Sequence, residues 1–333
     1  MRHFVSRKQA YQLFYILLAI TGVVIAWHPT PWVIALISLT GVLSTDANDN
    51  GPATTLEQSI IADEHQMHKF AKMFGRYNGF SALFGSLGAL SEGWLNHLHG
   101  FANSYNGFYV LVPVGLIGWF AASALNLKPL EESEVQSPRI KVMNVKGEIK
   151  RLALLFALDS SAGGLTTSAW LSYYLTHRYH ISATSLGYVF FVTSMLAAIS
   201  MFVAPLVAAR IGLVWTMVST HVLSNIFLII AAFNGHLAIA VMFLFFRASL
   251  SQMDIPTRQA LLMAVVAKED RMAAAAITNA ARYSVRPLAP TVTAGLEHIA
   301  LGAPLVVAGS IKVMYDVLIL QWARNRKYLS RDL

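Results

Sequence analysis

Residues 247–290 read RASLSQMDIPTRQALLMAVVAKEDRMAAAAITNAARYSVRPLAP, an apolar segment that ends in a run of polar and charged residues. The same arrangement occurs 205 to 206 positions earlier, at the end of another apolar segment. The later copy consists of Asp254, Glu269 and the pair Arg282-Tyr283, and the earlier copy of Asp49, Glu64 and the pair Arg76-Tyr77. The constant offset indicates an internal duplication. Two complete copies at this spacing would need more than the 333 residues present, so we expect one copy to be short.

The composition of the chain is that of a membrane protein. Apolar residues make up 56% of it, charged residues only 13%, and the mean hydropathy is +0.53. Soluble proteins carry about 25% charged residues. Apolar runs that reach the roughly 20 residues needed to cross a bilayer as a helix recur along the whole length. The ten predicted spans lie near 11–27, 31–47, 72–94, 107–126, 152–175, 184–207, 211–232, 237–256, 273–297 and 303–322.

These runs predict an all-α, polytopic bundle, because a membrane barrel would show strands of alternating polarity. The charge pattern orients the bundle. If Met1 is cytoplasmic, the loops and tails on that side hold 20 of the 25 Lys and Arg residues, whereas the opposite side holds only Arg178. Positive charge marks the cytoplasmic side, so both termini are predicted to lie in the cytoplasm. The protein itself is predicted to lie in the plasma membrane or inner membrane of the cell. The basic residues are spread over loops, so no nucleic-acid partner is expected.

A polar segment divides the spans into two groups. Residues 128–150 are the longest polar stretch; residues 1–127 contain four predicted spans and residues 151–333 contain six. The chain crosses the membrane six times between the two copies of the duplicated pattern, so both copies end a span on the same side. The repeats are therefore predicted to be parallel and not inverted.

Three segments resemble the major facilitator superfamily of transporters. Residues 247–290 resemble its tenth and eleventh helices, and the run LALLFALDSSAGGLTTSAWLSYYL at 152–175 resembles its seventh helix. The loop PLVAARIGL at 205–213 resembles the degenerate copy of the family's G-x-L-A-D-R-x-G-R-R loop, with Arg210 in place and Ala209 where Asp is typical. The resemblance covers essentially the whole chain, is specific for the superfamily, and says little about substrate.

The resemblance implies a two-bundle fold in which residues 1–127 are equivalent to family helices three to six and residues 151–333 to helices seven to twelve. The pair Arg7-Lys8 matches the end of the family loop that precedes helix three, whereas Ser6 and Phe4 depart from it. The first two helices would then be missing. The open explanations are an upstream start codon, a truncated gene, or a second chain that completes the first bundle.

The function implied is secondary active transport of an unidentified small molecule by alternating access, coupled to a proton or solute gradient. The alternative is a truncated, non-transporting remnant or a membrane scaffold. No enzyme activity is expected, because the chain has no nucleotide-binding loop, no convincing nucleophile elbow and no metal constellation. Cysteine is absent, which excludes thiolate metal sites, and no cofactor is predicted.

Charges inside the spans are the main candidates for substrate binding or coupling, because a charge near the bilayer centre costs roughly 2.5–3.5 kcal/mol on insertion scales. Arg247 lies near the middle of the eighth span and is predicted to bind an anion, to couple transport, or to pair with Asp159 or a carbonyl. Asp159, in the fifth span, is predicted to carry a proton, since a desolvated carboxylate can take one up, or to form a salt bridge with Arg247 or an Arg of the ninth span. Arg286 is assigned to the cavity or to the gate described next.

The duplicated charges are predicted to form a cytoplasmic gate whose opposite charges pair when that side is shut. The alternative is a static charged surface with weak pairs. The predicted gate residues are Asp49, Glu64, Arg76, Arg210, Asp254, Arg258, Glu269, Arg271 and Arg282. In the last span, Lys312 and Asp316 stand four residues apart and are predicted to be a structural ion pair. His221 is predicted to have a satisfied packing role.

Overall fold

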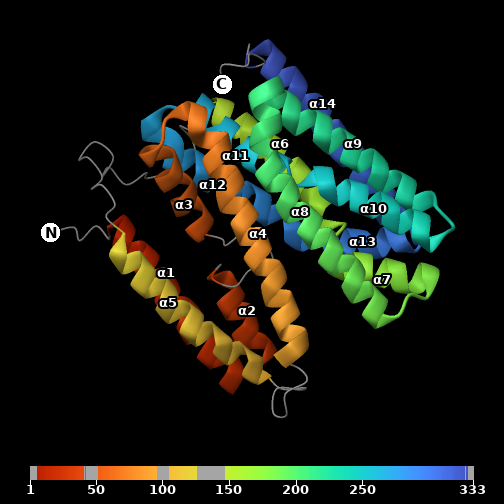
Figure 1. Cartoon of the computed structure of the whole chain (residues 1–333), viewed down its shortest axis with the longest axis horizontal. Helices are drawn as coiled ribbons and strands as arrows, with labels where there is room; N and C mark the ends of the chain where they lie inside the picture. The colour runs from red at the N-terminus through yellow and green to blue at the C-terminus, as the bar shows by residue number, and fades with distance from the viewer. Residues whose placement is uncertain are drawn as a thin grey trace. The chain divides into compact units, whose positions relative to one another are not determined.

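The computed structural model describes residues 6–40, 42, 52–95, 105–125, 147–326 and 328, and no strand occurs among them. The α-helices are α1 (Arg7–Trp27), α2 (Pro31–Leu39), α3 (Pro52–Glu64), α4 (Phe70–Leu95), α5 (Leu111–Ala124), α6 (Gly147–Gly164), α7 (Ser168–Tyr179), α8 (Ala183–Ile211), α9 (Leu213–Phe233), α10 (Leu237–Ser251), α11 (Asp254–Val265), α12 (Arg271–Val285), α13 (Ala289–Glu297) and α14 (Ala303–Asn325) (Figure 1). Four 3-10 turns are η1 (Met67–Lys69), η2 (Tyr105–Val110), η4 (Lys268–Asp270) and η5 (Arg286–Leu288). The predicted all-α class is confirmed.

Six helical stretches in the described part of the chain are long and apolar enough to cross a membrane, and all six coincide with predicted spans. They are Arg7–Trp27, Tyr105–Ala124, Thr184–Ile211, Leu213–Phe233, Leu237–Val265 and Ala303–Asn325. The predicted span near 72–94 is the helix α4, and the one near 31–47 is described only in part, as α2. The remaining two predicted spans are each divided between two helices: α6 and α7, and α12 and α13.

The chain forms two compact units. The first consists of Met1–Ile60 and Phe84–Met143, and the second of Ile61–Leu83 and Asn144–Leu333. The helix α4 therefore contributes to both units, because its first half belongs to the second unit. This division differs from the predicted boundaries at residues 127 and 150, which remain a prediction about the family's two bundles.

In the first unit, α1 packs along α5 (Figure 1). Gly115 and Gly118 of α5 allow this approach, because a Cβ atom at either position would lie less than 3 Å from Tyr15 or its neighbours on α1. Small residues at such contacts let two membrane helices come close together. At the end of the pair, the Gln12 Nε2 donates a hydrogen bond to the Ser123 hydroxyl at 2.8 Å.

In the second unit, the break between α6 and α7 follows from local sequence. α6 ends at Gly164, and the Thr167 hydroxyl then caps α7 by accepting a hydrogen bond from the Trp170 backbone N–H at 3.3 Å. Gly164 also faces α13, where a Cβ atom on it would lie only 2.5 Å from the Cβ of Ala289. Gly164 thus both ends a helix and admits a close neighbour.

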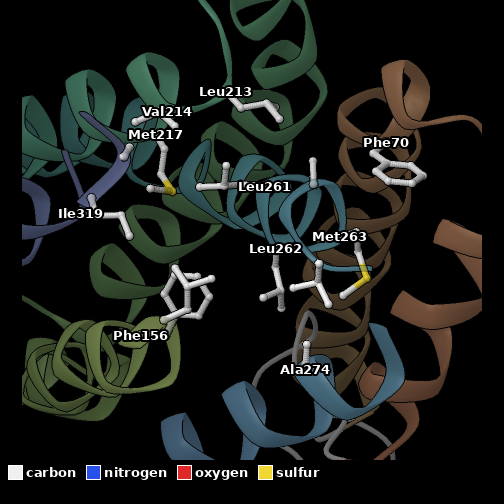
Figure 2. Packing of buried hydrophobic residues seen from close by; sticks show 14 of the residues in the cluster. Phe70, Phe156, Leu213, Val214, Met217, Leu261, Leu262, Met263, Ala274 and Ile319 are labelled. Atoms are coloured by element: carbon white, nitrogen blue, oxygen red, sulfur yellow. The ribbon is translucent and has the colours of Figure 1, made fainter. Parts of the chain in front are cut away.

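Two hydrophobic cores fill the second unit. The first gathers around Phe156 of α6, Met217 of α9, Leu261 of α11 and Ile319 of α14 (Figure 2). The second core is built from later residues of α6 and α9, from earlier residues of α14, and from α7, α10 and α13; its buried members include Ala162, Leu228, Leu244, Ala289 and Leu305.

Charged residues on three of these helices lie between the two cores. On α6, Asp159 lies between the residues that pack in the first core and those that pack in the second core. His221 on α9 and Lys312 on α14 also lie between the residues of their helix that pack in the two cores. The folding of these helices around two apolar cores therefore brings the three polar side chains to one level.

The contact between Gly164 and α13 gives a first prediction. Replacing Gly164 by Ala should lower the stability of the protein by about 1–3 kcal/mol, because the added methyl group cannot be accommodated beside Ala289 without moving a helix. Thermal unfolding of the purified chain in detergent micelles measures the effect. The control is Gly295→Ala on α13, where the added Cβ meets open space. An equal midpoint for Gly164→Ala and Gly295→Ala would contradict the close contact.

Candidate functional site

Six buried residues of the second unit form a charged cluster between α6, α9, α11 and α14. They are between 0% and 8% exposed. The members of the cluster are Asp159, His221, Asp254, Arg258, Lys312 and Asp316. Removing a charge from water costs several kcal/mol even after relaxation, so a buried group of this size requires close partners.

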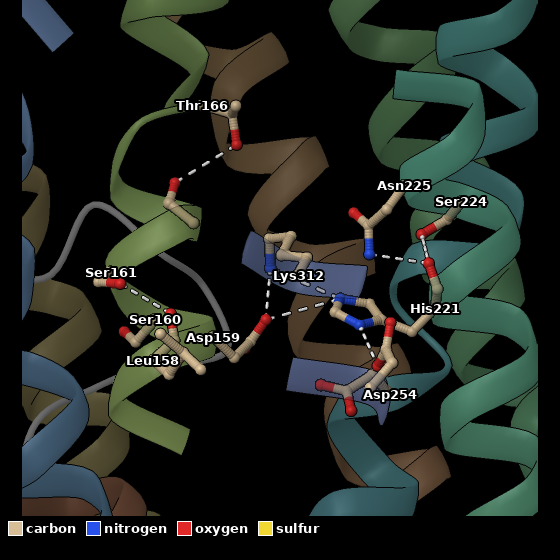
Figure 3. A network of polar contacts seen from close by, with 12 residues as sticks. Leu158, Asp159, Ser160, Ser161, Thr166, His221, Ser224, Asn225, Asp254 and Lys312 are labelled. Atoms are coloured by element: carbon tan, nitrogen blue, oxygen red, sulfur yellow. Dashed lines mark hydrogen bonds and ion pairs between the residues drawn. The ribbon is translucent and has the colours of Figure 1, made fainter. Parts of the chain in front are cut away.

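Asp159 is the centre of the cluster. The Lys312 ammonium lies 2.6 Å from its Oδ1, and the Arg258 Nη1 lies 3.2 Å from its Oδ2. The His221 Nε2 is 3.6 Å from Oδ1. Figure 3 shows Asp159, Lys312 and His221 pointing toward one another from three helices. Two opposite charges about 4 Å apart attract by about 4 kcal/mol at an effective dielectric constant near 20, which offsets much of the cost of burial.

Arg258 joins Asp159 to α11. Its Nη1 also lies 3.0 Å from the Asp254 Oδ2, one turn earlier on the same helix, and its guanidinium stands over the ring of Phe156, 5.5 Å from the centroid. Because Asp254 and Arg258 are spaced i, i+4, the start of α11 presents both side chains on one face. Asp159 thus receives one cation from α11 and one from α14.

His221 joins the other carboxylate of the cluster. Its Nδ1 is 2.8 Å from the Asp316 Oδ1, and its Nε2 is 3.5 Å from the Lys312 Nζ. The ring of Tyr315 meets the imidazole edge-on at a centroid distance of 5.9 Å. His221 therefore contacts a carboxylate through Nδ1 and the Lys312 ammonium through Nε2.

The structure corrects the predicted pairing of Lys312 with Asp316. The two side chains do lie on one face of α14, but Lys312 forms its ion pair with Asp159, and Asp316 pairs with His221. α14 packs against both α6 and α9, so cross-helix partners replace the partner one turn away. His221, which the sequence suggested was a packing residue, is a member of the cluster. A lone histidine in an apolar span was the only signal that could have indicated it.

The predicted pairing of Asp159 with Arg247 is not formed either, since the partners of Asp159 are Lys312, Arg258 and His221. The Nε of Arg247 is buried and has no hydrogen-bond partner in the described part of the chain. Such an unsatisfied donor costs about 1–3 kcal/mol, which is the reason to keep Arg247 as a candidate for ligand binding.

Arg286 lies next to the cluster. Its Nε donates a hydrogen bond to the Ser160 hydroxyl at 3.0 Å, and Ser160 directly follows Asp159 on α6. The Ser160 hydroxyl in turn donates to the carbonyl of Arg282 at 2.9 Å. These bonds join α6 to the end of α12, where η5 interrupts the helix. Arg286 is therefore linked to α6 through Ser160, the residue next to Asp159.

The predicted gate residues differ in their burial. Asp254 and Arg258 are buried in the cluster and are not surface charges, because Arg258 turns inward to Asp159. Arg282 is half-buried, and Asp49 lies outside the described residues. The exposed members are Glu64, Arg76, Arg210 and Glu269.

Arg271 is a predicted gate residue that contacts several segments. Its Nη1 donates to the carbonyl of Ala62 at 3.1 Å and lies 3.8 Å from the Asp63 carboxylate. Its Nε donates to the carbonyl of Met263 at 3.2 Å, and its guanidinium stands over Phe70. Arg271 therefore holds the ends of α3 and α11 at the start of α12. Among the described residues, no group of three or more His, Asp or Glu side chains has a geometry that could hold a metal ion.

The cluster predicts a measurable coupling between Asp159 and Lys312. Replacing Lys312 by Met leaves a buried carboxylate short of one cation and should cost about 3–5 kcal/mol of stability. The double variant Asp159→Asn with Lys312→Met should be less destabilised than the sum of the single variants by about 0.5–3 kcal/mol. Unfolding of all four proteins in detergent gives the coupling energy, and strictly additive effects would contradict the pair. As a control, the cycle for the pair Glu148 and Arg151, which is partly exposed and 3.9 Å apart, should give less than about 1 kcal/mol.

Comparison with known proteins agrees with this fold. The family model described as Major Facilitator Superfamily matches residues 3–290. The Saccharomyces cerevisiae protein named "Uncharacterized membrane protein YJR124C" is 21% identical over 344 residues, which cover 91% of this chain and 77% of the yeast protein.

Solved structures of transporters are similar over nearly the whole chain. The human organic anion transporter MFSD10 superposes with a TM-score of 0.74 at 16% identity, covering 94% of this chain and 77% of that one. The proton:xylose symporter XylE superposes with a TM-score of 0.74 at 15% identity, covering 95% and 80%. At these identities the likeness concerns the fold alone. Since the family model spans most of the sequence, the chain belongs to the Major Facilitator Superfamily, as its resemblance to that family predicted.

Proposed function

We propose that this protein is a secondary active transporter, which moves a small solute across the cell membrane by alternating access and uses a proton gradient or a solute gradient as the driving force. Membership of a transporter family supports a role in moving a solute across a membrane. The observation that carries the coupling is the buried cluster centred on Asp159, because charges are retained inside membrane proteins mainly where ions or substrates pass. Both termini are proposed to face the cytoplasm, from the distribution of Lys and Arg.

Within this proposal, Asp159 takes part in coupling and Arg247 contacts the solute. Asp159 is held by cations from two helices and contacts a histidine, so a change in protonation anywhere in the cluster alters its partners. The buried Nε of Arg247 has no acceptor among the described residues, and an anionic group would supply one. Arg286 stands beside Asp159 through Ser160 and could serve either role.

Transporters of similar structure suggest which solutes to screen first. One is an organic anion transporter, and two are symporters of a proton with xylose or with fucose. The unpaired donor of Arg247 favours an anion, so organic anions are the first class to screen and sugars the second. A thermal-shift screen of the purified protein against both classes selects solutes that bind the folded state.

The charges around Arg271 are proposed to act as the cytoplasmic gate. Arg271 bonds the carbonyl of Ala62 and lies near Asp63, so opening of that side would have to break these contacts. The exposed charges Glu64, Arg76, Arg210 and Glu269 are proposed to contribute more weakly, since exposed ion pairs are worth less than about 1 kcal/mol each.

The function is tested in proteoliposomes that contain the purified chain. A solute selected by the screen should accumulate against its concentration gradient when a proton gradient or a second solute gradient is imposed, and a protonophore should abolish the part driven by protons. Failure of every stabilising solute to cross the membrane would contradict transport and favour the alternative, a non-transporting remnant or a membrane scaffold.

Arg247 gives a specific prediction about the solute. Replacing it by Lys keeps the charge but removes the planar fork of donors, so uptake of the selected solute at limiting concentration should fall about tenfold, the equivalent of about 1.4 kcal/mol. The control is Arg178→Lys, at an exposed arginine of α7. Unchanged uptake by Arg247→Lys would remove Arg247 from the substrate site.

A further inference from the structure

The buried cluster is short of one positive charge. It contains three carboxylates, Asp159, Asp254 and Asp316, but only two permanent cations among the described residues, Arg258 and Lys312. The sixth member, His221, can be neutral or charged. A neutral His221 leaves the described cluster with a net charge of minus one inside the protein, and one bound proton balances it.

Unsatisfied atoms show where the deficit lies. Asp159 has three partners, whereas the Oδ2 of Asp316 and the Oδ1 of Asp254 are buried and have no hydrogen-bond partner among the described residues. The hydroxyl of Tyr315, the residue before Asp316 and itself fully buried, also has no hydrogen-bond partner in the described ranges. Within the described part of the chain, Asp316 contacts no permanent cation, and its partner is the imidazole of His221 at 2.8 Å. The missing charge is therefore at the His221–Asp316 end of the cluster.

The two ring nitrogens of His221 define two states. In the deprotonated state, Nδ1–H donates to Asp316 and Nε2 faces Lys312 as an acceptor at 3.5 Å. When a proton is added, it resides on the imidazole, or it resides on Asp316 and the histidine changes tautomer. Both arrangements place a hydrogen on Nε2, because Nδ1 remains engaged with Asp316. Nε2–H then faces the Asp159 carboxylate, 3.6 Å away, and can no longer accept from Lys312.

We propose that the His221–Asp316 pair binds one proton, and that the proton switches His221 from an acceptor for Lys312 to a donor toward Asp159. The proton belongs to the pair, as in other strongly interacting sites. This site is distinct from the proton-carrier role predicted for Asp159, because Asp159 is already balanced by two cations and changes only its partners.

Several charged or titratable groups surround the pair. The helices α6, α11 and α14 contribute Asp159, Asp254, Arg258, Lys312 and Tyr315. The helices α8 and α10 also pack on α9. Their titratable side chains in the described chain are Tyr188, Arg210 and Arg247, and none of these forms a hydrogen bond or ion pair with His221.

A proton fits this site better than a sodium ion. Hard metal cations prefer a shell of about six oxygen ligands, whereas the pair offers one free carboxylate oxygen beside an imidazole. The described His, Asp and Glu side chains also form no group with the geometry of a metal site. Sodium is kept as an outcome of the experiment.

The role of this proton in transport rests on the proposed function. Lys312 bridges α14 to α6 through Asp159 and to α9 through His221. Protonation of the pair removes the second bond and strengthens the contact between α9 and α6. A solute-driven movement of these helices would then be linked to uptake or release of one proton.

Nitrogen NMR of the histidine side chains tests the proton site without any transport assay. The full chain, labelled with 15N-histidine and reconstituted in proteoliposomes, is measured from pH 4.5 to 9.5. The spectrum of His221→Asn identifies the His221 signals, and Asn preserves a donor toward Asp316. We expect the Nε2 signal of His221 to change from the unprotonated to the protonated position within this range, and His298→Asn, at an exposed position, to leave that transition unchanged.

Three results would overturn the proposal. The first is an Nε2 signal that keeps one protonation state across the whole range. The second is a transition whose midpoint is the same in Asp316→Asn, where we expect a displacement of at least about one pH unit because the pair loses its charge. The third is a change of the Nε2 signal when sodium replaces choline at constant pH. A normal transition in a protein that transports nothing would leave the proton site intact and contradict only the proposed function.

Discussion

The ion pair between Lys312 and Asp159 is the interaction on which the second unit of this protein depends. It joins the last helix of the chain to α6 at a distance of 2.6 Å, inside the apolar interior. A carboxylate alone at this depth would be expensive, and so would an ammonium group. Together, and with Arg258 as a second cation for Asp159, they allow a polar layer to persist between two hydrophobic cores.

This polar layer makes the packing of the helices depend on charge. α6, α9 and α14 are held above and below the layer by apolar side chains, whose contacts tolerate small sliding movements, but within the layer each contact has a defined donor and acceptor. A change of one proton therefore alters which helix Lys312 and His221 bind, without any change in the apolar cores. Such an element has two discrete arrangements, which is what a transporter that alternates between two conformations requires.

The sequence predicted much of this fold because hydrophobic length and charge distribution act locally. The apolar runs predicted the membrane helices, although two predicted spans are each divided, one into α6 and α7 and the other into α12 and α13. The charged residues of the spans were identified individually for the same reason. Membership of the family followed from short motifs that the family model extends over residues 3–290.

The partners of the charged residues could not be predicted from the same information. Spacing along one helix places Lys312 and Asp316 on one face, but the rotation of α14 against α6 and α9 decides what they meet, and that rotation depends on packing across more than 90 residues of sequence. His221 was missed for this reason.

The most direct test of the central claim, that the buried cluster links proton movement to solute movement, is a measurement of both fluxes in the same vesicles. Proteoliposomes loaded with the pH indicator pyranine and given a solute that the protein transports should change their internal pH in proportion to the solute moved. The account predicts that His221→Asn moves solute without a matching change in internal pH. An unchanged ratio of protons to solute in His221→Asn would contradict it.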